Sequence, residues 1–245
     1  RNIQARKTAQ QIELELALEH ERVNLLSAFI ENVAHEFRTP LSIIGTRLYL
    51  MTLSDNAEQQ ETFKSIVQQQ MDRINNLVDI LLLRAKVEAT SPTSFVPVDI
   101  THMIRPITDK MIAKYNHTIQ LSLNITHSAS VVYGHTEYLA EALQQILDNA
   151  FQFTPDGGTI TVSAQVIAGI MQIDVQDGGI GIEADDLPHI FKAFWRHDKA
   201  HTTGGLGLGL SIAKQIIDQH QGEIIVDSTI GVGTLIRVLL PASND

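Results

Sequence analysis

Mostly apolar side chains recur at helical spacing along the first part of the chain. Steps of three and four residues alternate from Ala5 to Phe37, which is the heptad pattern of a coiled coil. The positions in this seam are Ala5, Ala9, Ile12, Leu16, Glu19, Val23, Leu26, Ile30, Val33 and Phe37. A seam this narrow on one long helix predicts that a second helix packs along it.

The predicted second helix follows a polar turn at residues 53–60. Apolar residues return at helical spacing from Phe63 through about Val87. They include Phe63, Ile66, Val67, Ile74, Leu77, Val78 and Leu81. Two antiparallel helices have no closed core, so we predict that a second copy of the chain completes a four-helix bundle. Docking of the hairpin on the rest of the same chain is the alternative.

Composition changes at residues 89–99, where "ATSPTSFVPVD" combines two prolines with small polar residues and predicts a linker. Helix and strand patterns are mixed after it. We expect helices at about 100–115, 136–151 and 208–220, and strands near 119–125, 131–133, 159–166, 170–175, 224–227 and 235–240. Because the strands arrive as hairpins, the pattern predicts an α+β sandwich with helices on one sheet face and disfavours a parallel doubly wound sheet.

Composition and charge narrow the possible functions. The 245 residues are 44% hydrophobic, which allows one or two domains with buried cores. The 28 acidic residues outnumber the 18 basic ones, so no basic surface is available for a nucleic acid. The absence of cysteine excludes disulfides, cysteine-bound zinc and thiol nucleophiles. No apolar run is long enough to span a membrane, and the start at Arg1 suggests a piece of a longer protein.

Two glycine clusters interrupt the second part of the chain. "DVQDGGIGI" presents Asp177 before Gly178, Gly179 and Gly181, and "TTGGLGLGLSIAKQII" runs directly into a predicted helix. Glycines let the backbone approach a ligand closely, and a helix start favours an anion such as phosphate. Either cluster alone is equally compatible with an ordinary turn. Neither a Walker loop nor a Rossmann turn fits, because the lysine and the preceding strand that these motifs need are missing.

The segment between the clusters and the helix before them carry further candidates. About twenty residues separate the two glycine clusters, which predicts a mobile lid. In "LQQILDNAFQF", Asn149 lies beside apolar residues of a predicted helix. It is either a polar group on the helix surface or, facing a triphosphate, a ligand of Mg²⁺, which fills its octahedron with phosphate and water.

Taken together, these motifs resemble the catalytic core of a bacterial sensor histidine kinase. "HEFRTPL" is similar to the H box of that family, "QQILDNAFQFTPDGG" to the N box, "DGGIGI" to the G1 box, "IFKAFWR" to the F box, "GGLGLGLSI" to the G2 box and "GVGT" to the G3 element. Their order is that of the family. The resemblance implies a dimeric helical hairpin that carries the phosphorylated histidine, followed by an ATP-binding α/β sandwich of the type shared with topoisomerase and chaperone ATPases.

The resemblance also implies domain bounds. It divides the chain into a coiled-coil signalling helix at residues 1–30, a dimerisation and histidine-phosphotransfer domain at 31–89, a linker at 90–98 and an ATP-binding domain at 99–245. It further implies a response-regulator partner, ATP and Mg²⁺ as cofactors, and a cytoplasmic position for this part of a protein that is held in the membrane by upstream segments.

Residue roles follow from the same resemblance. The resemblance implies that His35 is the phospho-acceptor and that Glu36 is its acid/base helper. It implies that Thr39 takes part in removing phosphate from the partner protein. The resemblance implies that Asn149 binds magnesium and that the Asp177 carboxylate recognises the adenine amino group. The remaining nucleotide contacts implied are Gly179, Gly181, Arg196, Gly205, Gly207, Gly209 and Thr234.

The chain departs from the family pattern at three positions. Gln145 stands where an asparagine is usual, Gln152 where a cation contacts phosphate, and His201 where an arginine is common. Lost positive charge near the phosphates weakens stabilisation of the developing charge, although Arg196 and Lys199 lie in the predicted lid. We expect slow but genuine kinase activity. The alternatives are an ATP-binding dimeric scaffold or mainly a phosphatase, and an ATPase of the chaperone or topoisomerase type, which would not need the H box.

The heptad pattern also predicts how His35 is presented. Val33 and Phe37 lie in the seam, so His35 is directed away from it and faces solvent. Glu36 is the nearest carboxylate that can accept the proton from one ring nitrogen while the other attacks phosphorus. Pro40 cannot donate to the carbonyl of Glu36, so we expect a bend or local loosening just beyond the histidine.

Overall fold

The structure is a computed structural model that describes residues 2–89, 94–115, 120–125, 131–196 and 206–243. For residues 2–11, 22, 25 and 125 it describes the backbone alone. The chain divides into two compact units, Arg1–Asp79 and Ile80–Asp245. The division falls inside a helix, so the last turns of that helix belong to the second unit.

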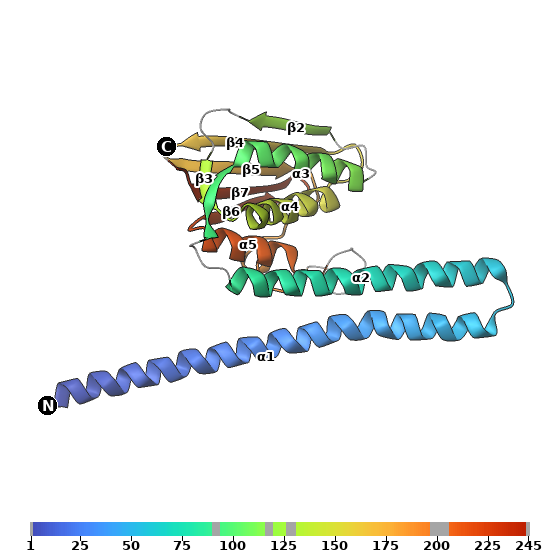
Figure 1. The fold of residues 1–245 in the computed structure, drawn as a ribbon, viewed down its shortest axis with the longest axis horizontal. Coiled ribbons are helices and arrows are strands. Elements are labelled where there is room, and N and C mark those ends of the chain that lie inside the picture. The colour runs from blue at the N-terminus through green and yellow to red at the C-terminus, as the bar shows by residue number, and fades with distance from the viewer. Residues whose placement is uncertain (1, 90–93, 116–119, 126–130, 197–205, 244–245) are drawn as a thin grey trace. The chain divides into compact units, whose positions relative to one another are not determined.

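The first unit is the predicted helical hairpin (Figure 1). Helix α1 (Asn2–Leu53) is followed by α2 (Ala57–Ala89), which continues into the second unit. The turn between them is closed by Asn56, whose Oδ1 accepts hydrogen bonds from the backbone N–H groups of Glu58 at 2.9 Å and Gln59 at 3.2 Å. These bonds satisfy donors that a helix start otherwise leaves unpaired, so Asn56 sets where α2 begins.

The apolar seam of α1 is exposed in the single chain. Ile12, Val23, Leu26 and Ile30 are 50–58% exposed, whereas Val33 and Phe37 further along are half-buried. The side chains of Ala5 and Ala9 lie outside the described part. Burial of such a stripe is the main driving force for helix association, so its N-terminal half is left for another helix to cover.

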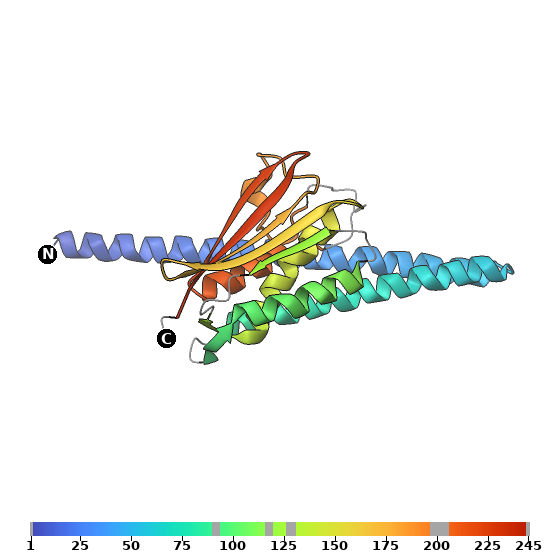
Figure 2. The ribbon, with the colours of Figure 1, turned by 90° about the horizontal axis from the view of Figure 1, so that it is seen from above.

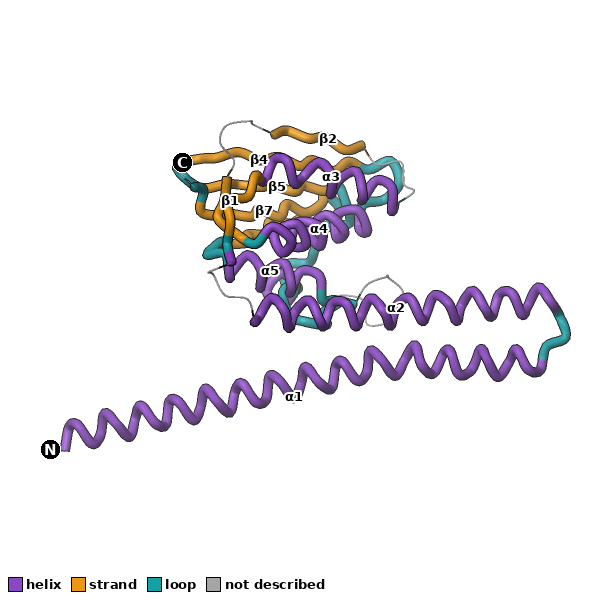
Figure 3. Tube along the Cα trace, in the orientation of Figure 1, coloured by secondary structure: helices purple, strands orange, loops and turns teal. Residues whose placement is uncertain are grey.

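The second unit contains a five-stranded sheet with the order β2-β4-β5-β7-β6. These strands are β2 (Gln120–Ile125), β4 (Thr159–Ile167), β5 (Ile170–Asp177), β6 (Glu223–Thr229) and β7 (Gly233–Pro241). Only the β2–β4 pair is parallel, and β4–β5, β5–β7 and β6–β7 are antiparallel. The predicted α+β class is confirmed, and the colours of Figure 3 distinguish the strands of this unit from its helices.

Three helices cover one face of the sheet, as Figure 2 shows. They are α3 (Ile100–Lys114), α4 (Thr136–Phe153) and α5 (Gly209–Gln219). Every second residue of the central strands is buried beneath them, for example Ile173 and Val175 on β5 and Val238 on β7. This alternation is the period-two pattern of a sheet with one packed face. The end of β5 is paired with the start of β7 in this sheet.

The sequence did not predict strand β1 (Val96–Asp99), which pairs antiparallel with β3 (Val131–Gly134). The end of the predicted linker is therefore a strand. Pro97 argued against a strand, but a two-stranded edge ribbon tolerates a residue without an N–H. Asp99 then caps α3, because its Oδ1 accepts from the N–H groups of Thr101 and His102. Burial opposes its ionisation, yet the hydrogen bonds from Thr101 and His102 lower the pKa of Asp99 to about 2.

Candidate active site

Asp177, the last residue of β5, is one of two buried carboxylates in the described part of the chain. Its Oδ1 accepts hydrogen bonds from the N–H of Gly179 at 2.9 Å and from the N–H of Thr234 at 3.1 Å. Thr234 is its register partner on β7. Burial raises the pKa of Asp177, and the two backbone bonds act against that rise. No described residue donates to Oδ2, so that oxygen remains available for a ligand.

The first glycine loop fits closely between neighbouring backbones. A Cβ built on Gly179 would lie 2.6 Å from the carbonyl oxygen of Phe153, the last residue of α4. Gly181 has φ +71°, and a Cβ there would lie 2.2 Å from the carbonyl oxygen of Thr229. Glycine is required at both positions. The N–H of Ile180 also donates to Phe153 O at 3.3 Å, so the loop after Asp177 lies on the C-terminal end of α4.

Asn149 lies on α4 about one turn before Phe153, whose carbonyl oxygen contacts this loop. Asn149 is half-buried, and its side chain makes no hydrogen bond to any described residue. The neighbouring Asp148 has a structural role, because it forms an ion pair with Lys114 and accepts from the Tyr115 hydroxyl at 3.1 Å. Burial and the Asp148 carboxylate together raise the pKa of Tyr115 well above its ordinary value. Asn149 is thus a polar side chain of α4 that is available to a ligand.

The second glycine loop contacts both the F-box segment and α4. The N–H of Phe194 donates to the carbonyl oxygen of Gly207 at 2.8 Å. Gly209 begins α5, and a Cβ there would lie 2.5 Å from Oε1 of Gln145. Gln145 in turn donates from Nε2 to Glu141 at 2.7 Å. The F box, the G2 box and the N box are therefore adjacent in the fold.

Part of the predicted lid lies outside the described residues. This applies to Lys199, His201 and Gly205, whereas Arg196 is the last described residue before the gap and is half-buried. The mobile lid itself remains a prediction. Gln152 is half-buried near the end of α4. The described nucleotide-site candidates Asn149, Asp177, Gly179, Gly181, Arg196, Gly207, Gly209 and Thr234 thus lie on loops and element ends of the second unit.

The residues can accommodate Mg²⁺ only together with a ligand that brings its own oxygens. Within the described residues, no group of three or more acidic or histidine side chains lies close enough to hold a metal ion. Asn149 offers a single amide oxygen, which is the kind of hard ligand that Mg²⁺ takes in small numbers alongside phosphate and water. The donor set therefore fits a magnesium–nucleotide complex.

In the hairpin, His35 is exposed on α1, as the heptad pattern predicted. Thr39 shares this side of the helix, and its Oγ1 donates to the carbonyl oxygen of His35 at 3.4 Å. Pro40 lies inside helix α1, which is a single uninterrupted helix that changes direction along its course in Figure 1. A bend or loosening located just beyond His35 remains a prediction. The phospho-acceptor candidate thus projects from a continuous helix.

Glu36, the predicted acid/base helper of His35, has a partner on the second helix. It is the second buried carboxylate, and its Oε2 accepts a hydrogen bond from the Arg73 guanidinium of α2 at 2.9 Å. Consecutive residues of a helix point in directions about 100° apart, so an outward His35 turns Glu36 toward the second helix. No signal in the sequence identified Arg73, which lies 37 positions away.

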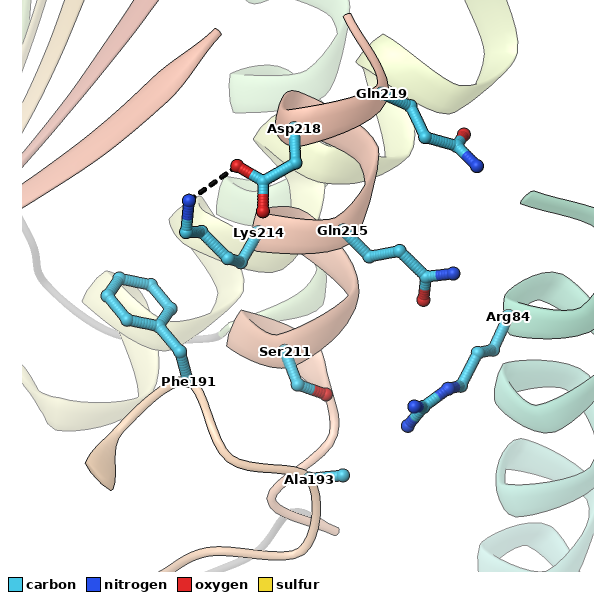
Figure 4. A pocket seen from close by; sticks show the side chains of 8 residues that line it. All are labelled: Arg84, Phe191, Ala193, Ser211, Lys214, Gln215, Asp218 and Gln219. Carbon is cyan, nitrogen blue, oxygen red and sulfur yellow. Dashed lines mark hydrogen bonds and ion pairs between the residues drawn. The ribbon is translucent and has the colours of Figure 1, made fainter. Parts of the chain in front are cut away.

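A separate hollow of about 470 Å³ lies along α5 in the second unit (Figure 4). Figure 4 shows that α5 supplies much of its lining, including the Lys214–Asp218 ion pair, while Arg84 lines it from the end of α2. Neither Asn149 nor Asp177 lines this hollow. It is therefore distinct from the site built by the glycine loops.

Two family sequence models match consecutive parts of the chain. Residues 25–90 match the His Kinase A (phospho-acceptor) domain, and residues 134–244 match the histidine kinase-, DNA gyrase B- and HSP90-like ATPase. The first contains His35 and the second contains Asn149 and Asp177. The chain belongs to the sensor histidine kinases.

Individual proteins agree with this membership. The phosphate regulon sensor protein PhoR of Pseudomonas aeruginosa is 34% identical over 225 residues, covering 88% of this chain and 50% of PhoR. The crystal structure of full-length ShkA in complex with AMPPNP is 26% identical with a TM-score of 0.65, covering 88% of this chain and 46% of that one. The histidine kinase ThkA in complex with the response regulator protein TrrA shares the fold, with a TM-score of 0.73, 22% identity, and coverage of 91% of this chain and 64% of that one.

This histidine kinase core spans 34–52% of the length of the curated relatives it matches first. None of the helices in the described part of the chain combines the length and the apolar character that crossing a membrane requires.

Proposed function

We propose that this chain uses ATP and Mg²⁺ to phosphorylate His35 and passes the phosphoryl group to an aspartate of a response regulator. The observation that carries the proposal is the exposed His35 in the segment that matches the phospho-acceptor domain. An exposed imidazole on a continuous helix can be reached by a separate nucleotide domain, whereas a buried one could not.

In the proposed nucleotide site, each described candidate has a distinct role. Asp177 accepts a hydrogen bond from the adenine amino group through Oδ2, because Oδ1 is already occupied by two backbone N–H groups. Gly207 and Gly209, with Gly205, line the phosphates through their backbone N–H groups, and Arg196 adds positive charge. Asn149 would hold Mg²⁺, which when bound offsets negative charge on the phosphates and so favours transfer.

The proposed chemistry at His35 needs one proton acceptor. The lone pair of one ring nitrogen forms a bond to the γ-phosphorus as the bond from phosphorus to the ADP oxygen breaks. The proton on the other ring nitrogen then passes to the carboxylate of Glu36 and on to water. Thr39, one turn beyond His35, is proposed to act in removal of phosphate from the regulator.

The proposed assembly is a homodimer in the cytoplasm. Its support is the exposed stripe at Ile12, Val23, Leu26 and Ile30, which a second copy of the hairpin would cover in a four-helix bundle. A single hairpin leaves this apolar area in water, so dimerisation stabilises the helices on which His35 and Thr39 lie. The response regulator would meet the phosphorylated histidine there.

Incubation with γ-labelled ATP and Mg²⁺ tests the proposal. We expect acid-labile, base-stable label on the wild type, none on His35→Gln, and none on Asn149→Ala. The exposed Asn75→Ala on α2 is the control for Asn149 and should label normally. Label that persists in His35→Gln identifies a different nucleophile. Nucleotide binding without any label favours the ATP-binding scaffold. The reason to consider that alternative is that Gln145 and Gln152 depart from the family motif.

A further inference from the structure

The ion pair between Glu36 and Arg73 joins the two helices of the hairpin beside the phospho-acceptor. The Arg73 guanidinium donates to Oε2 of Glu36 at 2.9 Å, and the two side chains are 27% and 10% exposed respectively. The Lys64–Glu61 ion pair on the same hairpin is far more exposed and joins residues of one helix. The Glu36–Arg73 pair is therefore sheltered from solvent and links one helix to the other.

The proposed chemistry requires the Glu36 carboxylate to be held in a defined position, and this pair restrains it. Neighbouring residues on a helix do not face each other, so Glu36 has no intrinsic tendency to stay close to the His35 ring. Its side chain has three torsions and, left alone, would sample many positions. The bond to Arg73 uses Oε2, while no described residue donates to Oε1. One carboxylate oxygen is thus anchored and the other is open.

We infer that Arg73 is a positioning residue: it holds the Glu36 carboxylate so that Oε1 can take the proton from the His35 ring. The inference rests on the proposed autophosphorylation. Arg73 contacts neither ATP nor the reacting nitrogen, and it acts through Glu36 alone. Its charge also compensates a carboxylate that would otherwise be buried without a partner.

Two other roles for the pair make different predictions. A pair that only fastens α1 to α2 would affect stability and leave the chemistry of intact protein unchanged. A pair that withholds Glu36 from His35 would slow phosphorylation, so its removal would increase the rate. A double-mutant cycle separates these roles, because residues that act as one unit show non-additive effects.

The experiment compares Arg73→Gln, Glu36→Gln, the double variant and Arg73→Lys in the full chain. Initial labelling rates are measured over a range of ATP concentrations, with helix content and dimer fraction determined for each variant. Arg47→Gln is the matched control, since the Arg47 guanidinium lies over the Phe63 ring at 5.5 Å and also joins the two helices.

We expect Arg73→Gln to lower the maximal rate by about tenfold with an unchanged KM for ATP, as lost positioning affects the chemical step and not nucleotide binding. The double variant should be no slower than Glu36→Gln. Arg73→Lys should recover part of the rate, because lysine keeps the charge without the planar fork. Arg47→Gln should label like the wild type.

A second readout does not depend on turnover. The ¹⁵N signals of the His35 ring, identified by their loss in His35→Gln, should change to the same degree in Arg73→Gln and Glu36→Gln and stay unchanged in Arg47→Gln.

If the wild type is labelled but the losses of rate in the double variant are additive, the inference is overturned. It is also overturned if Arg73→Gln is labelled faster than the wild type, or if the His35 ring signals change in Glu36→Gln alone. Absence of label on the wild type would instead refute the proposed function, and the inference would fall with it.

Discussion

The hairpin and the ATP-binding domain each bury one carboxylate beside their proposed chemistry, but they hold it by different means. Glu36 is held by a side-chain cation from the facing helix, whereas Asp177 is held by backbone N–H groups of its own loop and of the neighbouring strand. A side-chain pair depends on how two helices pack, and that packing can shift by small rotations. A backbone cradle depends on strand register, which cannot shift without reversing every side chain of the strand.

This difference assigns the adjustable half of the reaction to the hairpin. A change in helix packing would alter the Glu36–Arg73 pair without touching the nucleotide site, while Asp177 stays in place as long as β5 and β7 remain paired. Under the proposed function, we expect a signal transmitted along α1 to act on the use of the phospho-acceptor rather than on the affinity for ATP.

The largest expected effect comes from breaking the cradle of Asp177. Gly233 has φ +131°, and a Cβ there would lie 2.0 Å from the carbonyl oxygen of Asp177. We expect Gly233→Ala to separate the start of β7 from the end of β5 and to weaken nucleotide binding on the order of 100-fold in a titration with a fluorescent ATP analogue. Near-normal affinity would show that the cradle is more adaptable than its geometry indicates.

Gly231→Ala is the control for this substitution. Gly231 lies in the same turn with φ +75°, but a Cβ there would meet nothing within 4 Å. It should therefore cost only the strain of a left-handed backbone, about 1 kcal/mol of stability, and leave ATP affinity near that of the wild type.

A smaller effect is expected from changing only the open oxygen of Asp177. Asp177→Asn can still accept from Gly179 and Thr234 through its remaining oxygen, but its amide nitrogen would oppose the adenine amino group. Because both backbone bonds are kept, we expect a loss at the lower end for a charged hydrogen bond, about 1.5 kcal/mol, which corresponds to roughly tenfold weaker ATP binding by calorimetry. Equal affinities of the two proteins would contradict the assignment of Asp177 to adenine.

Asp174→Asn provides the comparison on the same strand. Asp174 lies three residues earlier on β5, and its carboxylate pairs with both Nε and Nη2 of Arg237 at 2.8 Å. It is not part of the cradle, so its substitution should leave nucleotide affinity unchanged even though it removes an ion pair.

Local patterns in the sequence identified the hairpin, the glycine loops and the exposure of His35. These features are encoded by repeats and short motifs, whose residues are close together in the sequence and stay close together in the fold. The G1 motif predicted Asp177 as a candidate, but its bond to Thr234 depends on strand register across 57 positions. The sequence marked Glu36 as a candidate but did not predict its direction, because its partner Arg73 has no local signature in an amphipathic helix.

Strand β1 was missed for a different reason. Its four residues, Val96–Asp99, include a proline and follow a proline-containing polar stretch, which is typical of a linker. What makes them a strand is the partner β3, which lies far along the chain. Short strands of this kind are specified by tertiary pairing more than by their own composition.

A moderate, pH-dependent effect is expected at His220, which closes the end of α5. Its Nδ1 lies 2.7 Å from Ile216 O, and its Nε2 accepts from the N–H of His135 at 2.9 Å, which assigns a neutral ring with the proton on Nδ1. Phe95 stacks on the ring at 4.5 Å. Burial lowers the pKa of His220 below its ordinary value of 6.5, although the bond to Ile216 O opposes the shift.

The sign of the pH effect follows from this direction. Below pH 6.5 the unfolded chain binds a proton at this histidine that the folded chain resists, so the free energy of unfolding should fall until the pH reaches the folded pKa. Denaturant titrations between pH 7.5 and about 5 should show this slope in the wild type and a flatter one in His220→Gln. His20→Gln, at an exposed position on α1, should keep the slope of the wild type. Equal slopes in all three proteins would contradict a buried neutral His220.

The smallest expected effect lies in the hairpin and tests whether it is energetically separate from the nucleotide site. Asn56→Ala removes the side-chain oxygen that caps α2, which should cost about 1 kcal/mol of helix stability. Thermal unfolding followed by circular dichroism should show this loss, while ATP affinity stays at the wild-type value because Asp177 is held by the sheet. Asp55→Ala, in the same turn but without a capping bond among the described residues, should leave both quantities unchanged. A drop in ATP affinity with Asn56→Ala would mean that the two carboxylate sites are coupled through the fold, and that the hairpin does not adjust independently.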